Sequence, residues 1–573
     1  MRNGLEEAHG EALSRHVGER SRAQGAKRCR GSHGVAPVQD ALGRAGRADT
    51  ILSDPLGAHL AVVTFGRFNA AHGVPKLGDR AEPHGRRGFE HAELAPVKLY
   101  DPRQKRSRLV SATRFERLLD GFEPDFDFVP APRIAEAEFA QRIERIRREA
   151  TINGYDATLV HADDAPRFAT SNGFLRYTCD WEREGILIIP TDEDHGLQLI
   201  SFFTESAVLP PAGEAVGVEA IWQISPLGRE YAGRPGNPTA MTAQACARTL
   251  RSFGYESGSF GVMGDESSWK YWDLVLEELP KARIFDAKAT ISQMQHVRSV
   301  AEQAQLRSAA QLIDIGYQAM CHVLRPGVTD REMYAAFTFA QMARGGEWGD
   351  GYQIGINQWG THVGKPYGHV VRPGDLINLY ASAVTYHGYT AQSARMMAVG
   401  EISAAQETTL EMCTDAVRRA ERLIRPGVRF SELHQAAFSA YIERGYLKDD
   451  TTKNMPWNWA ANEDGSPRRV REEYVPDEDY ERQGRRLGHV YPASVGPHNP
   501  NLGHEVGTPG YTRFNVTSHN TDRAEAGNVF VLHAQWLDPL SSGANIGDCY
   551  LVTETGFENL TCHTDLATYR VAG

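Results

Sequence analysis

Apolar and polar positions follow two spacings in the middle of the chain. Residues 136–156, EAEFAQRIERIRREATINGYD, carry apolar side chains at helical spacing and end at Gly154. Short apolar runs bounded by polar stretches follow at 157–162, 185–191, 197–203, 259–264 and 282–287, with a helical pattern at 242–254 between them. Alternating strands and helices of this kind predict an α/β domain over roughly 130–290.

Residues 1–110 show neither spacing outside the run HLAVVTF at 59–65. They are rich in Gly, Ala, Arg and His and hold too little apolar surface to offset the entropy of ordering. We expect a disordered extension, or a start site assigned too far upstream.

A weak internal repeat organises the rest of the chain. The segments LRPGVTDREMYAAF (324–337) and IRPGVRFSELHQAAF (424–438) share Arg-Pro-Gly-Val at an offset of 100 residues. In each copy a helix ends, Pro-Gly turns the chain and a second helix begins; Thr329 and Glu332 form a capping-box pattern. A strand pattern opened by a turn follows each copy, at 373–384 and 526–537. Duplication predicts a pseudo-two-fold α+β domain with a cleft between its halves, interrupted by a polar insertion at 447–486.

Composition narrows the class of protein. No apolar run is long enough to span a membrane, and the net charge of −11 argues against a nucleic-acid or anionic-membrane partner. The seven cysteines form no Cys-x-x-Cys pair, as expected for reduced thiols. These features predict a cytoplasmic protein.

Several short motifs occur in a fixed order in the second half. They are Gly374-Asp375, Gly388-Tyr389-Thr390 with Arg395, Gly488-His489, His498, Gly527 and the closing LVTETGFENLT at 551–561. Their order and spacing resemble the creatinase/aminopeptidase P family of pita-bread enzymes. The resemblance implies a pita-bread catalytic domain over 293–573, preceded by a smaller creatinase-type α/β domain, and a homodimer.

The metal-dependent members of this family hold two divalent ions with two Asp, one His and two Glu. Matched residue by residue, those positions fall on Tyr380, Gln392, His489, His533 and Gly547. A pair of dications needs bridging anionic oxygens, so we expect no metal pair. A single transition metal at His489 and His533, with Tyr380, is left open because imidazole suits such ions.

The segment GINQWGTH (355–362) resembles the creatinase branch, which cleaves a C–N bond without metal. The resemblance assigns the general acid/base to His362, with His489 and His498 as further catalytic histidines. The two acids that bind the cationic substrate of creatinase fall on Ser393 and His533, so a cationic guanidine substrate is not expected.

The sequence therefore predicts a metal-independent hydrolase or lyase with His acid/base catalysis, acting on a small polar and anionic molecule. The predicted substrate-binding residues are Tyr380, Gln392, Arg395, His533 and Glu505, where Arg395 has an alternative role as a structural ion-pair partner. Two alternatives remain: a metallopeptidase of the Xaa-Pro type, and a non-catalytic pita-bread module that binds peptides or proteins.

Overall fold

The computed structural model describes most of the chain after its first 116 residues. The described ranges are 117–162, 173–202, 215–264, 268–347, 354–357, 366, 368–447, 457–461, 467–471, 501–507, 514–538 and 542–573. The predicted N-terminal extension, 1–110, lies outside the described residues.

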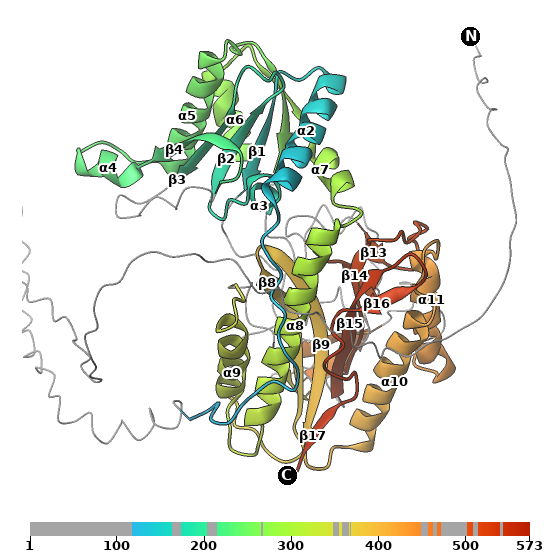
Figure 1. The fold of residues 1–573 in the computed structure, drawn as a ribbon. Helices are drawn as coiled ribbons and strands as arrows, with labels where there is room; N and C mark the ends of the chain where they lie inside the picture. The colour runs from blue at the N-terminus through green and yellow to red at the C-terminus, as the bar shows by residue number, and fades with distance from the viewer. Residues whose placement is uncertain are drawn as a thin grey trace, which may run out of the picture. The chain divides into compact units, whose positions relative to one another are not determined.

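A six-stranded mixed sheet occupies the range predicted for the smaller domain (Figure 1). Its order is β4-β3-β2-β1-β5-β6, with β1 parallel to β5 and antiparallel to β2. The strands are β1 (Ala157–Ala162), β2 (Gly185–Pro190), β3 (Leu197–Phe202), β4 (Val218–Ile224), β5 (Ser259–Met263) and β6 (Arg283–Asp286). Five of them match the predicted runs. Strand β4 was not predicted, because it lies at the edge of the sheet and only one of its seven side chains is buried.

The helices of this domain are α2 (Glu136–Asn153), α3 (Phe174–Cys179), α4 (Pro226–Tyr231), α5 (Pro238–Ser252), α6 (Trp269–Glu278) and α7 (Lys288–Met294). Helix α2 ends where predicted, because Gly154 adopts a left-handed conformation with φ 69°. Helix α5 begins at Pro238, after Asn237 accepts a hydrogen bond from the Ala240 N–H.

A nine-stranded sheet lies in the second half of the chain. Seven of its strands follow the order β13-β12-β14-β15-β9-β8-β7, β16 pairs with β15, and β17 pairs with β9. Its strands are β7 (Ile354–Ile356), β8 (Leu376–Tyr386), β9 (Tyr389–Val399), β12 (Gly503–Glu505), β13 (Asn515–Val516), β14 (Val529–Asp538), β15 (Ser542–Val552), β16 (Phe557–Asn559) and β17 (Tyr569–Val571). Within the predicted insertion, β10 (Trp457–Ala461) and β11 (Pro467–Arg471) pair as a separate hairpin.

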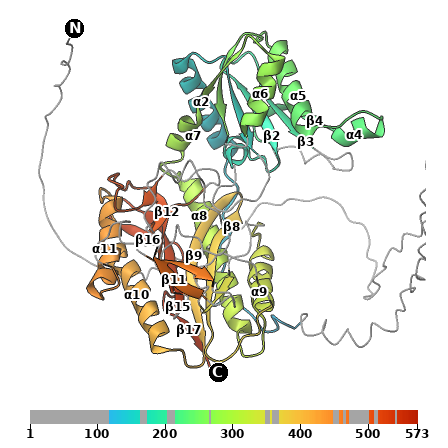
Figure 2. The same cartoon turned by 180° about the vertical axis from the view of Figure 1, so that it is seen from behind.

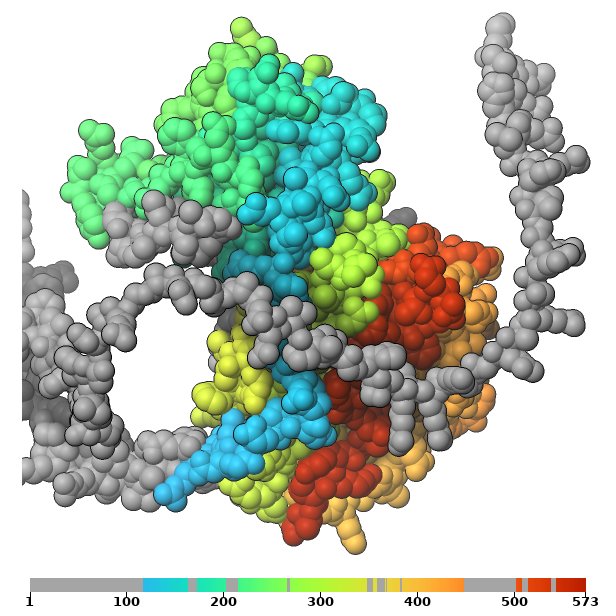
Figure 3. All heavy atoms as spheres, in the orientation of Figure 1, coloured from blue at the N-terminus to red at the C-terminus, as the bar shows by residue number. Residues whose placement is uncertain are grey.

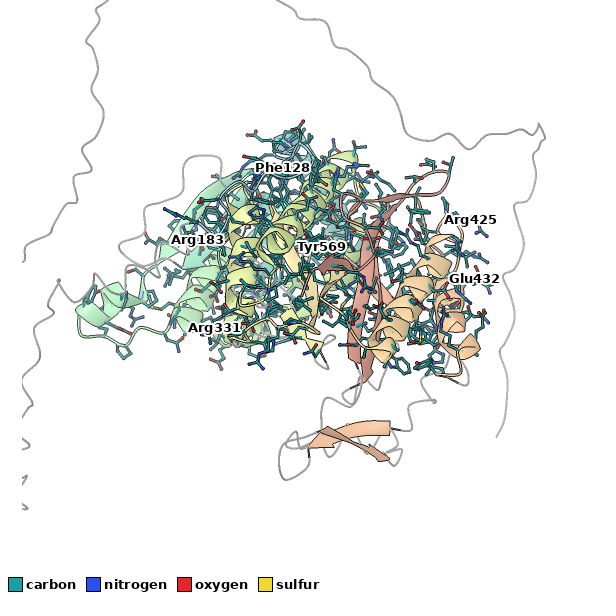
Figure 4. The ribbon with its side chains drawn as sticks, turned by 90° about the horizontal axis from the view of Figure 1, so that it is seen from below. Phe128, Arg183, Arg331, Arg425, Glu432 and Tyr569 are labelled. Atoms are coloured by element: carbon teal, nitrogen blue, oxygen red, sulfur yellow. The ribbon has the colours of Figure 1, made fainter. Side chains whose placement is uncertain are left out.

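Two helix pairs flank this sheet. They are α8 (Val300–Val323) with α9 (Asp330–Met342), and α10 (Ala404–Glu421) with α11 (Phe430–Glu443). In the reverse view of Figure 2, β9 and β15 lie between α9 on one side and α10–α11 on the other. Figure 4 shows Arg331 of α9 and Glu432 of α11 on opposite sides of the domain. In the space-filling view of Figure 3, the C-terminal residues, red, lie beside the orange residues of α10 and α11.

The internal repeat is a structural duplication. The Gly327 N–H donates to the Val371 carbonyl at 2.8 Å, and the Gly427 N–H donates to the Ala524 carbonyl at 2.8 Å. Both glycines have positive φ, 90° and 84°. The next helix of each copy begins with the same acid, since Glu332 and Glu432 each accept a hydrogen bond from the backbone N–H three residues before them.

The strand pairs β8–β9 and β14–β15 repeat as well, at an offset of 153 residues. Gly374 and Gly527 open them with φ 92° and 93°. Their N–H groups donate to Val399 and Val552, which are also 153 residues apart. The pseudo-two-fold axis therefore passes between the equivalent strands β9 and β15, which bridge each other at Ala394 and Gly547.

A buried ion pair connects the two halves at this axis. We call the contact between β9 and β15 the seam, and this pair the seam ion pair. The guanidinium of Arg395 on β9 donates to Asp548 Oδ1 at 2.5 Å and to the Gly547 carbonyl at 2.6 Å, and both partners lie on β15. Arg395 and Asp548 are pseudo-symmetry equivalents, and their side chains are 1% and 2% exposed. The remaining guanidinium hydrogen bonds go to Ala394, Thr561 and Thr564.

No helix in the described part of the chain is both long enough and apolar enough to cross a membrane.

Replacing Arg395 with Met is expected to lower the free energy of unfolding by about 3–5 kcal/mol, because Asp548 is left as an unpaired buried charge. The matched control is Arg307→Met. Arg307 makes a similar pair with Glu558 at 2.7 Å, but both side chains are nearly two-fifths exposed, so the loss there should stay within about 1 kcal/mol. Urea denaturation measures both. Equal losses would show that the seam ion pair is not a major source of stability.

Candidate active site

Four residues lie in one row across the centre of the large sheet. Strand register places Tyr380 opposite Ala394, Ala394 opposite Gly547, and Gly547 opposite His533. Directly opposed residues of antiparallel strands share a face. The row is symmetric about the pseudo-two-fold axis, since Tyr380 and His533 are equivalent and so are Ala394 and Gly547. We call this side of the sheet the site face.

Two outer side chains of the row meet over the two small inner ones. The rings of Tyr380 and His533 contact edge to face, with centroids 5.6 Å apart. Gln392, two residues from Ala394 and on the same face, donates a hydrogen bond from Nε2 to the Tyr380 hydroxyl. The structure therefore brings together Tyr380, Gln392 and His533 from three strands.

The hairpin that carries Tyr380 and Gln392 contains a β-bulge. Two residues of β8, between Ala381 and Val384, oppose the single Gln392 of β9. The extra residue shifts the strand register by one between the turn at His387–Gly388 and Tyr380. Because of this shift, Tyr380 and Gln392 lie on the same face of the sheet. The hairpin end is also anchored, because Tyr389 receives a hydrogen bond at 3.2 Å from the buried Arg142 of α2.

A second histidine completes the group. His504 on β12 lies beside His533, with ring centroids 5.5 Å apart. Burial lowers the pKa of His533 to about 3, helped by the neighbouring His504, and burial lowers the pKa of His504 to about 4. Burial also raises the pKa of Tyr380 above its usual value. At neutral pH the phenol, the amide and both imidazoles are therefore uncharged.

These residues do not fit a pair of divalent ions. None of the four outer and inner positions of the row carries a carboxylate, and within the described residues no group of three His, Cys, Asp or Glu side chains is placed to hold a metal. At Gly547 the backbone itself leaves no room, since a Cβ there would lie 2.2 Å from the Leu532 carbonyl oxygen. A glutamate at this position requires the two strands to move apart.

Two further residues of the predicted site, Arg395 and Glu505, form ion pairs within the protein. Arg395 pairs with Asp548, in agreement with the structural ion-pair role considered for it, and its role as a substrate anchor stays a prediction. Glu505 accepts a hydrogen bond from Arg298 at 2.9 Å, and both side chains are at most 4% exposed. Its carboxylate therefore compensates a buried cation, and its role as a substrate ligand stays a prediction.

The three predicted catalytic histidines, His362, His489 and His498, lie outside the described residues. Their catalytic role stays a prediction. His504 was given no role in the sequence analysis. The signal for it was present, because Gly503-His504 is a second Gly-His pair like Gly488-His489.

Comparison with known proteins agrees with this fold. Residues 304–554 match Metallopeptidase family M24. The solved Xaa-Pro dipeptidase from Bacillus anthracis is 18% identical, with a TM-score of 0.54 over 76% of this chain and 100% of that chain. The X-Pro aminopeptidase from Thermotoga maritima MSB8 is 16% identical, with a TM-score of 0.55 over 75% of this chain and 99% of that one.

Two curated relatives cover less of the chain. An uncharacterized peptidase of Staphylococcus aureus (strain MW2) is 24% identical over 290 residues, which are 48% of this chain and 65% of that protein. An uncharacterized hydrolase/peptidase of Sinorhizobium fredii (strain NBRC 101917 / NGR234) is 29% identical over 177 residues, which are 30% of this chain and 45% of that protein. The chain thus matches less than two thirds of the length of these relatives.

The family match covers residues 304–554, which form most of the second half of the chain. This confirms the resemblance to the creatinase/aminopeptidase P family and the predicted α+β pita-bread fold with its internal repeat.

The lowered pKa values of His533 and His504 predict a pH-dependent stability. In the unfolded chain they titrate near about pH 6.5, whereas in the folded chain they titrate at about 3 and about 4. Between these values the unfolded chain binds protons that the folded chain excludes, so stability is present above about pH 6.5 and is lost as the pH falls. A variant with His504→Gln and His533→Gln should lack this pH dependence, which amounts to at most about 1.4 kcal/mol of unfolding free energy per pH unit for each histidine.

The check is urea denaturation of both proteins at about pH 7.5 and about pH 5, on either side of the unfolded histidine pKa. The difference between wild type and variant isolates these two residues from the other titrating groups. A variant that loses as much stability as the wild type on acidification contradicts the buried neutral imidazoles.

Proposed function

We propose that this protein is a hydrolase of the M24 fold that cleaves a C–N bond in a small uncharged polar molecule without a metal pair. The family domain supports a hydrolase or peptidase-like enzyme. The single observation that carries the finer proposal is the row Tyr380–Ala394–Gly547–His533 with Gln392. Hydrogen-bonding and small residues stand there at the positions where the metal-dependent members hold carboxylates.

The chemistry of this row suits a neutral substrate. The phenol hydroxyl, the amide and the imidazoles offer hydrogen bonds without a formal charge, in surroundings that exclude water and so strengthen such bonds. The anionic substrate predicted from sequence depended on Arg395 and on cationic histidines. Arg395 is now paired with Asp548, and His533 and His504 are neutral, so the described part of the site offers no cation to an anion.

Proton transfer remains assigned to His362 by resemblance. With a pKa of about 3, His533 is too weak a base to serve at neutral pH. In the proposed reaction His362 takes a proton from water as its oxygen adds to the carbonyl carbon. It returns that proton to the leaving nitrogen as the C–N bond breaks. In the same reaction, Tyr380 and Gln392 donate hydrogen bonds to the substrate. A homodimer remains part of this proposal.

The first experiment measures metal binding and peptidase activity. Purified protein is incubated with Mn²⁺, desalted and analysed for metal, and hydrolysis of Ala-Pro and Gly-Pro is followed with and without Mn²⁺. The Xaa-Pro dipeptidase of Bacillus anthracis, treated identically, is the reference. We expect no retained metal pair and no Mn²⁺-dependent hydrolysis. Two retained ions with dipeptide cleavage establish the metallopeptidase alternative.

The second experiment searches for turnover among small neutral carboxamides by measuring released ammonia or amine. Turnover should persist in EDTA and fall by at least about 100-fold in His362→Ala, which removes the acid/base. His195→Ala, in the smaller domain, is the matched control and should behave like wild type. Carboxamides that bind without turnover support the non-catalytic module instead.

A further inference from the structure

Two buried carboxamides on the large sheet have no hydrogen-bond partner among the residues that the structure describes. Asn378 on β8 and Asn545 on β15 are both 0% exposed. The Nδ2 and Oδ1 atoms of each make no hydrogen bond within the described residues. No other carboxamide in the described part of the chain has both of its polar atoms buried and unpaired. Buried polar groups in folded proteins are almost always satisfied, so these four atoms indicate a missing partner.

Both side chains belong to the site face. Asn378 precedes Tyr380 by two residues and Asn545 precedes Gly547 by two, and side chains two apart on a strand share a face. In the row that contains them, Asn378 lies opposite Met396 of β9, and Asn545 lies opposite Gln535 of β14. The Asn545 N–H contacts Met396 Sδ at 3.5 Å, which joins the two pairs across β9 and β15. This row lies about 7 Å along the strands from the central one.

His533 adds a donor from the central row. Gln535 Nε2 lies 3.3 Å from His533 Nδ1. An amide nitrogen only donates, so Nδ1 is the acceptor and the proton of the neutral ring lies on Nε2. His533 Nε2 is buried and has no hydrogen-bond partner within the described residues.

Pseudo-symmetry sharpens the contrast. Asn545 is the equivalent of Gln392, 153 residues further along the chain. The carboxamide of Gln392 is bonded to Tyr380 within the protein. Its equivalent is unpaired, although the backbone around it repeats. Both equivalent positions therefore carry an amide side chain, and only that of Gln392 is hydrogen-bonded within the described residues.

The chemistry of these atoms defines what they bind. Together they present amide N–H donors, an imidazole N–H donor and carbonyl acceptors, all uncharged. A carboxylate ligand would satisfy the donors and leave both carbonyl oxygens facing an anion, whereas a carboxamide supplies donors and acceptors at once.

We propose that Asn378, Asn545 and His533 form a binding subsite for the carboxamide group of a small neutral ligand. This subsite deepens the proposed function, on which it rests for the identity of the ligand as substrate. Its place beside the central row puts the bound group next to Tyr380 and His533.

The probe pair is acetamide and acetate, which have nearly the same shape and differ in charge. Crystals of the full chain are soaked in each at neutral pH. We expect acetamide to bind to Asn378, Asn545 and His533, and acetate to leave the site unchanged. Three results overturn the proposal. The first is that acetate binds to these atoms as well as acetamide does. The others are that acetamide is an adventitious additive only, found at unrelated positions, or that ordered water alone occupies these atoms.

Stability of the free protein gives a second readout. Asn378→Leu and Asn545→Leu remove unpaired polar atoms at similar volume, so the unfolding temperature should stay the same or rise while acetamide binding is lost. Asn528→Leu is the matched control. Asn528 is equally buried, but its carboxamide bonds the His296 carbonyl and the Glu525 N–H, each at 2.7 Å. That variant should lower the unfolding temperature.

A fall in unfolding temperature for Asn378→Leu or Asn545→Leu as large as that for Asn528→Leu shows structural amides and contradicts the subsite. These outcomes are separate from those that test the proposed function. Acetamide binding is read without turnover, and retained Mn²⁺ or Xaa-Pro hydrolysis is measured independently.

Discussion

The contact between β9 and β15 holds the two halves of the catalytic domain together. Ala394 and Gly547 bridge there, and on the opposite face Arg395 reaches across to Asp548. Both pairs are equivalent under the internal duplication, so one joint fixes the pseudo-two-fold axis and the spacing of the site. The residues at the bridge are small. Their size lets Tyr380 and His533 meet over the sheet from strands that are not neighbours.

The same closeness explains why the site is uncharged. Gly547 approaches the backbone of β14 so closely that a side chain there has no space. His533 is 2% exposed and keeps a neutral ring because burial disfavours the imidazolium. Two buried ion pairs near this contact compensate their own charges, Arg395 with Asp548 and Arg298 with Glu505. The strands thus form a pita-bread scaffold around a set of neutral hydrogen-bonding groups.

Much of this arrangement was predictable from sequence. The repeated Arg-Pro-Gly-Val turns and the Gly-opened strands predicted the duplication, because glycine permits the positive φ that both turns require. Counting from Gly374 and Gly527 placed Tyr380 and His533 at equivalent positions. The ion-pair partners of Arg395 and Glu505 were not predictable, since Asp548 and Arg298 lie far along the chain. The contact of His504 with His533 was not predictable either, because it depends on the pairing of the three-residue strand β12 with β14.

The most direct test of the account is anomalous diffraction from crystals grown with Mn²⁺ at neutral pH. Neutral donors around a crowded Gly547 predict no anomalous peak among Tyr380, Gln392, His504 and His533. Two strong peaks seated between these side chains would contradict the account and place the protein among the metal-dependent members of its family.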